Sequence, residues 1–281
     1  MSRISFLNGE FLPHEKCLVH IEDRGFQFAD GAYEVTLFKN GKLIDGDAHV
    51  KRLFRSLNEM KIEHNLEKEN LLKMQIELFA KNNMDEGICY IQVTRGATNR
   101  VPYVPKNLPV TISATVSLGK KMTPEEFEKG VSIMTHDDIR WKRCDIKSVA
   151  LFASSFINQK AKDLGFDDAI FVRDGVVTEG TFANAFIVDE AGNLVTKPAD
   201  NLILQGITRN RLIEIAQENG IKVVERSFDV SELVKAKEVF LTSSSLILRP
   251  VTQIDGKVIG NGKAGEVSQK LASLYQQFTS N

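Results

Sequence analysis

The segment RWKRCDIKSVALFASSFINQKA, residues 140–161, sets a charged run directly before an apolar one. After Lys147 the apolar residues follow the three- and four-residue spacing of a helix face, which predicts a helix over residues 148–165. Before it, Cys144 and Ile146 are typical of the end of a buried strand. Lysine is almost never fully buried without a partner. In isolation, such a lysine either extends to water or takes part in chemistry, and the first is more common.

The composition is that of an ordinary folded chain. Its 281 residues exceed the usual size of one domain, and 42% hydrophobic with 26% charged residues excludes disorder as the main feature. A net charge of −1 gives no electrostatic footprint for nucleic acid or a membrane surface. There is no run of 18 apolar residues and no signal-peptide core. Three scattered cysteines are too few for a disulfide framework or a zinc site, which predicts a cytoplasmic protein.

Turn signals divide the chain into short strands and helices. Asn-Gly or Asp-Gly pairs begin at residues 8, 40, 174 and 255 and predict four two-residue hairpins. Amphipathic spacing predicts helices over 47–62 (with Asp47 as N-cap), 67–83, 207–219 and 264–278. Residues 119–124 are predicted to link an N-terminal domain, 1–118, to a C-terminal domain, 125–281, that carries Lys147. Hairpins and helices in both halves predict a two-domain α+β protein with mixed sheets and flanking helices.

The sequence lacks the motifs of several enzyme classes but contains two segments suited to phosphate. Nucleotide phosphate loops, zinc-protease helices and serine elbows are missing, and the histidines do not have metal-ligand spacing. LQGITRNRL (204–212) instead places a turn at a helix start, where free N–H groups favour an anion. FLTSSS (240–245) ends a strand with hydroxyl groups. Together with one unexplained lysine, they suggest a phosphorylated cofactor that forms a Schiff base, and pyridoxal phosphate fits this description.

Seven segments carry a resemblance to a known family. They are EDRGFQFADGAYEV (22–35), HVKRL (49–53), YIQVTRG (90–96), DIRWKRCDIKS (138–148), VTEGTFANAF (177–186), LQGITR (204–209) and FLTSSS (240–245). Over roughly residues 4–275, the chain resembles the fold-type IV pyridoxal-phosphate enzymes, and most of all their D-amino-acid aminotransferases. The resemblance implies a two-domain fold with the cofactor site between the domains.

The resemblance also implies roles for individual residues. Lys147 would form the Schiff base with pyridoxal phosphate and would carry the proton to and from the substrate Cα. Glu179 would pair with the pyridine nitrogen, and Leu204 would lie on one face of the ring. The phosphate would be held by Arg52, Ile207, Thr208, Ser243 and Ser244. No metal is implied.

For the substrate, Tyr33 would face the α-carboxylate and Arg100 would bind it, from a loop that completes the neighbouring site of a homodimer. One position departs from the family pattern. Pro102 stands where these aminotransferases have a histidine that contacts the substrate, and proline has no side-chain donor. Arg249 or Tyr103 is hypothesised to compensate, although a surface arginine is the simpler interpretation of Arg249.

The implied reaction is a ping-pong transamination in which D-alanine and 2-oxoglutarate give pyruvate and D-glutamate. Two enzyme activities of the same fold remain as alternatives: branched-chain L-amino-acid aminotransferase and aminodeoxychorismate lyase. A cofactor-binding protein without turnover is a further alternative, against which the intact Lys147, Glu179 and Arg52 argue. The sequence does not fix the range of amino donors and acceptors.

Overall fold

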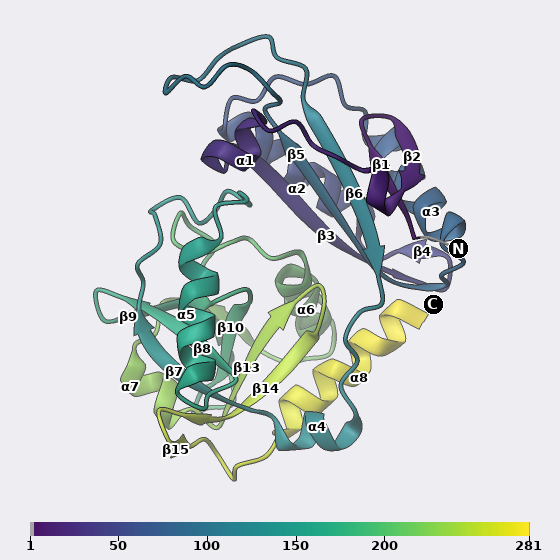
Figure 1. Ribbon diagram of the computed structural model, residues 1–281. Coiled ribbons are helices and arrows are strands. Elements are labelled where there is room, and N and C mark those ends of the chain that lie inside the picture. The colour runs from purple at the N-terminus through teal and green to yellow at the C-terminus, as the bar shows by residue number, and fades with distance from the viewer. Residues whose placement is uncertain (1–2, 281) are drawn as a thin grey trace. The chain divides into compact units, whose positions relative to one another are not determined.

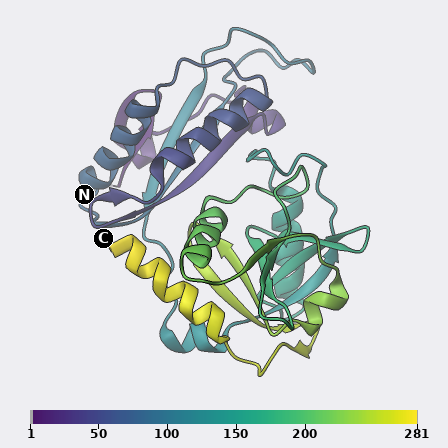
Figure 2. The same ribbon diagram turned by 180° about the vertical axis from the view of Figure 1, so that it is seen from behind.

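The structure is a computed structural model and describes residues 3–280. The chain forms two compact units (Figures 1 and 2). The first unit extends to Gly119 and also includes Ile146–Ala150, and the second contains Lys120–Asp145 and continues from Leu151. Both units combine helices with a sheet, which confirms the predicted α+β class. Among the described residues, no helix is both long and apolar enough to cross a membrane.

The first unit is built on a six-stranded antiparallel sheet. Its strand order is β2 (Glu10–Pro13), β1 (Ile4–Leu7), β6 (Thr111–Ser117), β5 (Glu86–Thr94), β3 (Gly31–Lys39) and β4 (Lys42–Leu43). Alternate residues of β3 are buried because successive side chains point to opposite faces of a sheet. Helices α2 (Gly46–Glu59) and α3 (Lys68–Lys81) cover one face of this sheet, as Figure 2 shows, and contribute Leu53, Leu57 and Phe79 to its core.

All four predicted hairpins are present. The strand pairs β1–β2 and β3–β4 turn at Asn8-Gly9 and Asn40-Gly41, and in the second unit two more pairs turn at Asp174-Gly175 and Asp255-Gly256. The first residue of each turn has a φ between 48° and 52°, and each glycine has a φ between 76° and 99°. Positive φ at both central positions is the geometry that Asn-Gly and Asp-Gly favour in hairpins.

The second unit is built on a mixed nine-stranded sheet. Its main path is β12 (Val223–Glu225), β11 (Leu194–Thr196), β10 (Asn184–Val188), β13 (Glu238–Ser243), β14 (Ile247–Ile254), β7 (Val131–Asp137), β8 (Asp168–Arg173) and β9 (Val176–Gly180), and β15 (Lys257–Val258) pairs with β14. Strands pair in parallel at β12–β11, β14–β7 and β7–β8 and antiparallel elsewhere. The predicted mixed character therefore belongs to this sheet, whereas the sheet of the first unit is antiparallel.

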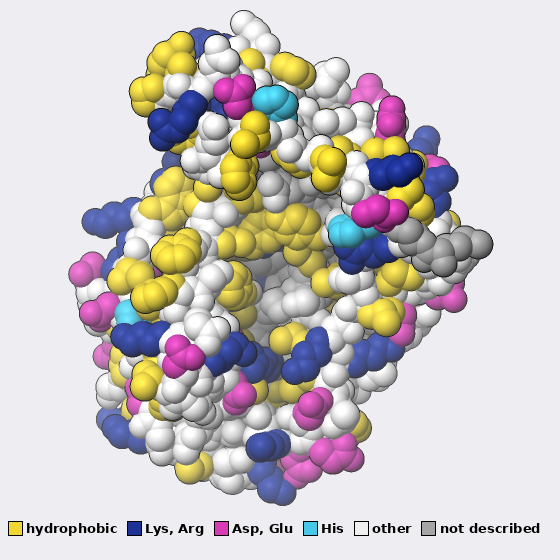
Figure 3. Space-filling model, in the orientation of Figure 1, with side chains coloured by type: hydrophobic (Ala, Val, Ile, Leu, Met, Phe, Trp, Pro, Cys, Tyr) yellow, Lys and Arg dark blue, Asp and Glu magenta, His cyan; other side chains and the backbone are white. Residues whose placement is uncertain are grey.

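Helices cover the second sheet with apolar side chains. Helices α6 (Ile207–Glu218) and α8 (Glu266–Ser280) join a core cluster that contains the stacked rings of Phe186 and Phe240. Helix α5 (Phe152–Asp163) buries Ile157 and Ala161 beside Phe171, and the short helix α7 (Val230–Lys235) buries Leu233. On the visible surface, acidic and basic side chains are interspersed (Figure 3), in keeping with the small net charge.

The segment around Lys147 differs most from prediction. Helix α5 begins only at Phe152, because Lys147 and Val149 bond to β3 instead: Tyr33 N donates to Lys147 O, and Val149 N donates to Gly31 O, both at 3.0 Å. Residues 146–150 consequently group with the first unit, whereas Lys147 was predicted to belong to a domain spanning 125–281.

Two smaller predictions also differ from the structure. Cys144 and Ile146 are buried, as expected, but lie in an irregular turn rather than a strand. Asp47 is not the N-cap of α2, because the helix already begins at Gly46 and the capping position is Asp45. The chain passes from the first unit to the second between Gly119 and Lys120, within the predicted linker 119–124, and Pro124 begins a short helix, α4 (Pro124–Lys129), which Thr123 caps reciprocally with Glu126.

Candidate active site

Lys147 lies beside β3 in the first unit, where it contacts Tyr33 and Ser56. Its Nζ is 4.2 Å from the centroid of the Tyr33 ring, and its backbone N–H donates to Ser56 Oγ at 3.2 Å. Tyr33 in turn stacks on Tyr90, with 5.5 Å between ring centroids. The structure therefore brings together the predicted Schiff-base lysine and the predicted substrate-facing tyrosine, and Tyr33 lies on the face of β3 opposite to the one that α2 covers.

On the covered face of β3, three charged or titratable side chains are buried together. Arg52 donates from Nε to Glu34 Oε1 at 2.7 Å and from Nη2 to Oε2 at 2.9 Å, a fork that fixes the guanidinium plane. His49 Nδ1 lies 2.8 Å from Glu34 Oε2. Although burial alone would raise it, the charge of Arg52 holds the pKa of Glu34 far below its usual range. Burial lowers the pKa of His49, so the neutral imidazole donates from Nδ1 to the Glu34 carboxylate.

Glu34 was not identified from the sequence, although a signal for it exists. It occupies an inward-facing position of β3, between the buried residues Ala32 and Thr36. Because a fully buried carboxylate needs a partner, its place in the alternating pattern predicts a nearby cation. That cation is Arg52. Its two hydrogen bonds to Glu34 set the orientation of the guanidinium group.

Arg100 lies in the irregular segment that follows β5. It is exposed, and its guanidinium carbon is 5.0 Å from the centroid of the Phe28 ring. Arg24 contacts the same ring at 4.4 Å and donates from Nη1 to the carbonyl of Val101 at 2.9 Å, which anchors the segment. Within the described part of this chain, Arg100 has no ion pair, and no contact joins it to Tyr33.

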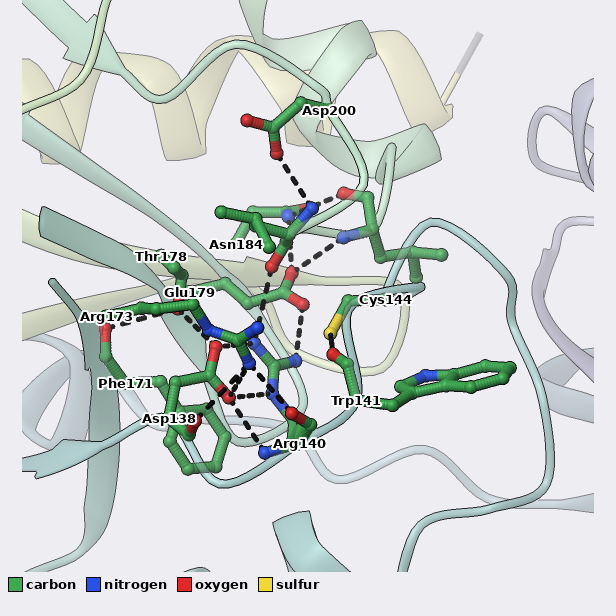
Figure 4. A network of polar contacts seen from close by, with 12 residues as sticks. Asp138, Arg140, Trp141, Cys144, Phe171, Arg173, Thr178, Glu179, Asn184 and Asp200 are labelled. Carbon is green, nitrogen blue, oxygen red and sulfur yellow. Dashed lines mark hydrogen bonds and ion pairs between the residues drawn. The ribbon is translucent and has the colours of Figure 1, made fainter.

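In the second unit, Glu179 accepts three hydrogen bonds at the end of β9. Arg140 Nη1 donates to Oε1 at 2.6 Å, while Asn184 Nδ2 and the backbone N–H of Leu204 donate to Oε2 at 3.0 and 3.1 Å. Figure 4 shows this carboxylate surrounded by donors. Burial raises the pKa of Glu179, and the adjacent Arg140 opposes that rise. The backbone hydrogen bond places Leu204 next to Glu179. The residue predicted to lie on the cofactor ring therefore neighbours the carboxylate predicted to pair with the ring nitrogen.

The two predicted phosphate segments lie on neighbouring elements of the second unit, because α6 contacts β13. Gly206 is the N-cap of α6 and has no side chain to cap the helix, and among the described residues no hydrogen bond from a side chain to the amides of Ile207 and Thr208 is found. A β-carbon on Gly206 would lie 2.0 Å from Asn184 Oδ1, which explains the glycine. Ser243 ends β13, and Ser244 follows in the turn.

One buried hydroxyl within the second of these segments, FLTSSS, has no hydrogen-bond partner among the described residues. Thr242 Oγ1 is buried and makes no hydrogen bond among the described residues. Unpaired buried polar atoms are rare in native proteins, and this one is suited to donate to a group bound beside β13. Free helix amides with several hydroxyls form the donor set that a phosphate group requires.

Arg249, hypothesised to compensate for Pro102, has a structural partner instead. From β14 its Nη1 donates to Asp168 Oδ2 at 3.3 Å. The other carboxylate oxygen of Asp168 accepts from Asn158 and Thr181. The pair with this buried carboxylate gives Arg249 a structural role in the second unit.

Comparison with known proteins identifies the family. Residues 31–254 match the family model described as amino-transferase class IV. The chain belongs to the class IV aminotransferases. The D-alanine aminotransferase of Bacillus licheniformis is 39% identical over 96% of this chain and 94% of its own length, and that of Listeria monocytogenes is 38% identical over 97% and 93%. The branched-chain aminotransferase of Escherichia coli, at 21% identity, shares the fold with a TM-score of 0.92 over 99% and 95% of the two chains.

Class IV aminotransferases depend on pyridoxal phosphate, and this enzyme is one of them. Its residues fit the cofactor chemically. The uncapped amides of α6 with Thr208, Ser243 and the orphan hydroxyl of Thr242 suit a phosphate, and the ionisable carboxylate of Glu179 suits a protonated ring nitrogen.

Proposed function

We propose that this aminotransferase moves the amino group of D-amino acids to 2-oxo acids, with D-alanine as donor and 2-oxoglutarate as acceptor. The observation that carries the proposal is the near-full-length similarity to D-alanine aminotransferases of two bacteria. Function depends on the site rather than the fold, and the residues predicted for the cofactor and the substrate all lie within the matched length. The structural likeness to a branched-chain aminotransferase concerns the fold alone.

Each unit contributes identifiable chemistry to this proposal. When bound, pyridoxal phosphate supplies an electron sink for the negative charge that develops at the substrate Cα. Lys147 anchors the cofactor covalently and moves the proton at Cα, and Glu179 holds the proton on the ring nitrogen. Arg52, fixed by Glu34, binds the phosphate with Ile207, Thr208, Ser243 and Ser244, and Leu204 lies on the ring. The two half-reactions follow each other in a ping-pong cycle.

We further propose a homodimer in which Arg100 binds the substrate carboxylate in the partner's site and Tyr33 faces that carboxylate. Two observations support it. Arg100 is exposed and has no ion pair with the described residues of its own chain, although its segment is anchored by Arg24. An arginine suits this role because its guanidinium forks onto a carboxylate.

We also propose a cytoplasmic location. Cys17, Cys89 and Cys144 are all free thiols, and the last two are buried. Proteins that work in a reducing compartment keep such thiols, whereas secreted proteins pair theirs.

A panel of D- and L-amino acids, each assayed with 2-oxoglutarate, tests the proposed reaction. We expect turnover with D-alanine and none with L-leucine or L-valine. Lys147→Ala serves as the inactive control, and Lys142→Ala serves as the matched control for loss of a nearby lysine. Preferential turnover of the branched L-amino acids would overturn the proposed substrate class.

A further inference from the structure

Glu179 ends a chain of alternating buried charges in the second unit. The order is Arg173, Asp138, Arg140 and Glu179, and each side chain contacts the next (Figure 4). Asp138 is 0% exposed and Glu179 6% exposed. A carboxylate taken out of water tends to take up a proton unless an opposite charge contacts it. The ionisation of Glu179 therefore depends on the only cation that touches it among the described residues, Arg140.

Arg140 is held in one orientation by its other contacts. Its Nε and Nη2 donate to the two oxygens of Asp138 at 2.9 and 3.0 Å. Its guanidinium carbon lies 4.5 Å from the centroid of the Phe171 ring. Thr178 Oγ1 and Arg173 Nη2 hold Asp138 in turn, at 3.1 and 3.2 Å. With one edge of the guanidinium fixed, Nη1 is left to donate to Glu179.

The hydrogen bonds of Glu179 leave one acceptor position on a specific oxygen. Each carboxylate oxygen accepts two hydrogen bonds, and Oε2 already accepts from Asn184 and Leu204. Oε1 accepts from Arg140 and, among the described residues, from no other donor. A further N–H donor is accordingly directed to Oε1, the oxygen that Arg140 also contacts.

Resting on the proposed function, we propose that Arg140 is a positioning residue that keeps Glu179 ionised and leaves Oε1 as the acceptor for the ring N–H of pyridoxal phosphate. A protonated Glu179 would be a donor at one oxygen and could not hold that ring proton. Asp138 has the opposite electrostatic effect on Glu179, because its negative charge disfavours a second carboxylate nearby. Arg140 and Asp138 are thus expected to shift the ionisation of Glu179 in opposite directions.

Infrared titration of the full-length chain, stripped of cofactor, tests this directly. The Glu179 carboxyl band is isolated by subtracting the spectrum of the matching Glu179→Gln protein in each background. Arg140→Met should raise the pKa of Glu179 by about 1–3 units, the usual effect of one adjacent charge. Asp138→Asn should lower it. Arg226→Met, which breaks the exposed pair with Glu232, is the matched control and should leave the titration unchanged.

Opposite shifts in the pKa of Glu179 would support the proposal, because structural damage alone would not raise this pKa in one variant and lower it in the other. An unchanged Glu179 titration in Arg140→Met would overturn it. If Arg140→Met does not fold, Asp138→Asn decides alone. A pKa of Glu179 that is not lower in Asp138→Asn than in wild type also contradicts the proposal.

A second measurement separates this proposal from the proposed function. We expect wild-type protein to bind pyridoxal phosphate and Arg140→Met to bind it at least ~10-fold more weakly at neutral pH, because the ring N–H loses an ionised partner. Failure of wild-type protein to bind pyridoxal phosphate would overturn the proposed function and leave the infrared result standing. Wild-type binding and activity with equal affinity in Arg140→Met would overturn only the role of Arg140.

Discussion

The backbone of Lys147 is bonded to Tyr33, and its side chain lies over the same residue. Tyr33 N donates to Lys147 O at 3.0 Å, and Lys147 Nζ lies 4.2 Å from the ring centroid. The lysine is thus placed by a strand far away in sequence rather than by the helix that follows it. The placement therefore depends on main-chain bonds and not on the type of side chain at position 147.

Replacing Lys147 by alanine should remove activity and preserve the fold. The bonds to Tyr33 and Ser56 use the backbone and persist in Lys147→Ala. Loss of the proton-transferring amine should lower turnover by roughly 10³-fold or more. Steady-state kinetics with circular dichroism check both parts. In wild-type protein, borohydride reduction followed by peptide mapping should find the cofactor on Lys147, and a label on Lys142 would contradict the assignment.

Glu179→Gln should weaken the binding of pyridoxal phosphate about as much as Arg140→Met does, by ~10-fold or more, and should lower turnover further. The amide oxygen of glutamine still accepts from Asn184 and Leu204, so the local structure should be retained. A neutral amide cannot hold the ring proton as an ionised carboxylate does, and turnover should fall by roughly 10²-fold or more. Equilibrium binding of pyridoxal phosphate and kcat are the two measurements. Activity near that of wild type would show that Glu179 has no electronic role.

The pair of Glu34 and Arg52 should make stability depend on pH in acid. The pKa of Glu34 is lowered in the folded chain, so its stabilising effect is complete above its unfolded pKa of about 4.3 and is lost as the pH falls below that value. Comparing wild type with Glu34→Gln in urea should give a constant difference from pH 5 to 7, on the order of 3–5 kcal/mol for a broken buried pair.

The same difference should shrink between about pH 4 and pH 3, because the unfolded chain then takes up a proton at Glu34 that the folded chain does not. Glu63→Gln provides a control for removal of an exposed glutamate and should show no such trend. A difference between wild type and Glu34→Gln that stays constant down to pH 3 would mean that folding does not lower the pKa of Glu34.

Arg249→Ala should affect stability and leave substrate binding unchanged. The arginine is paired with Asp168, so its loss removes a hydrogen bond to a charged group, worth about 1.5–3 kcal/mol. The KM for D-alanine should not change, whereas Pro102→His should lower it by adding a donor near Arg100. Thermal unfolding and steady-state kinetics test the two variants side by side. A KM raised by Arg249→Ala would return this arginine to the substrate site.

Mixing two inactive variants tests the proposed homodimer. If Arg100 acts in the partner's site, a mixed dimer of Lys147→Ala and Arg100→Ala contains one complete site. Random exchange of subunits should then restore about a quarter of wild-type activity per subunit, since half of the dimers are mixed. Sedimentation velocity reports the dimer itself. No recovery after proven subunit exchange would place Arg100 in the site of its own chain or outside any site.

Local patterns predicted the elements well, and long-range pairing decided what they missed. The four hairpins follow from turn chemistry within two residues, and α2, α3, α6 and α8 follow from apolar spacing. The late start of α5 depends on bonds to Gly31 and Tyr33, more than 100 residues away, which no local pattern encodes. Arg249 was linked to the substrate through proximity in sequence, and the structure pairs it with Asp168 instead.

Some residues of the candidate site could be predicted from local sequence, and others were found only in the structure. Lys147, Glu179 and Arg52 were recognisable from motifs because their chemistry restricts the residue type. Their supporting partners, Glu34 and Arg140, became visible only once strand register and a loop brought opposite charges together. A charged residue on the inward face of a strand was the available signal for Glu34.

The configuration of the amino acid formed tests the central claim most directly. Wild-type protein with pyridoxal phosphate, D-alanine and 2-oxoglutarate should produce pyruvate and glutamate in equal amounts, and chiral chromatography should identify the glutamate as the D-enantiomer. Lys147→Ala should form neither product. Formation of L-glutamate, or turnover of L-leucine in preference to D-alanine, would contradict the account.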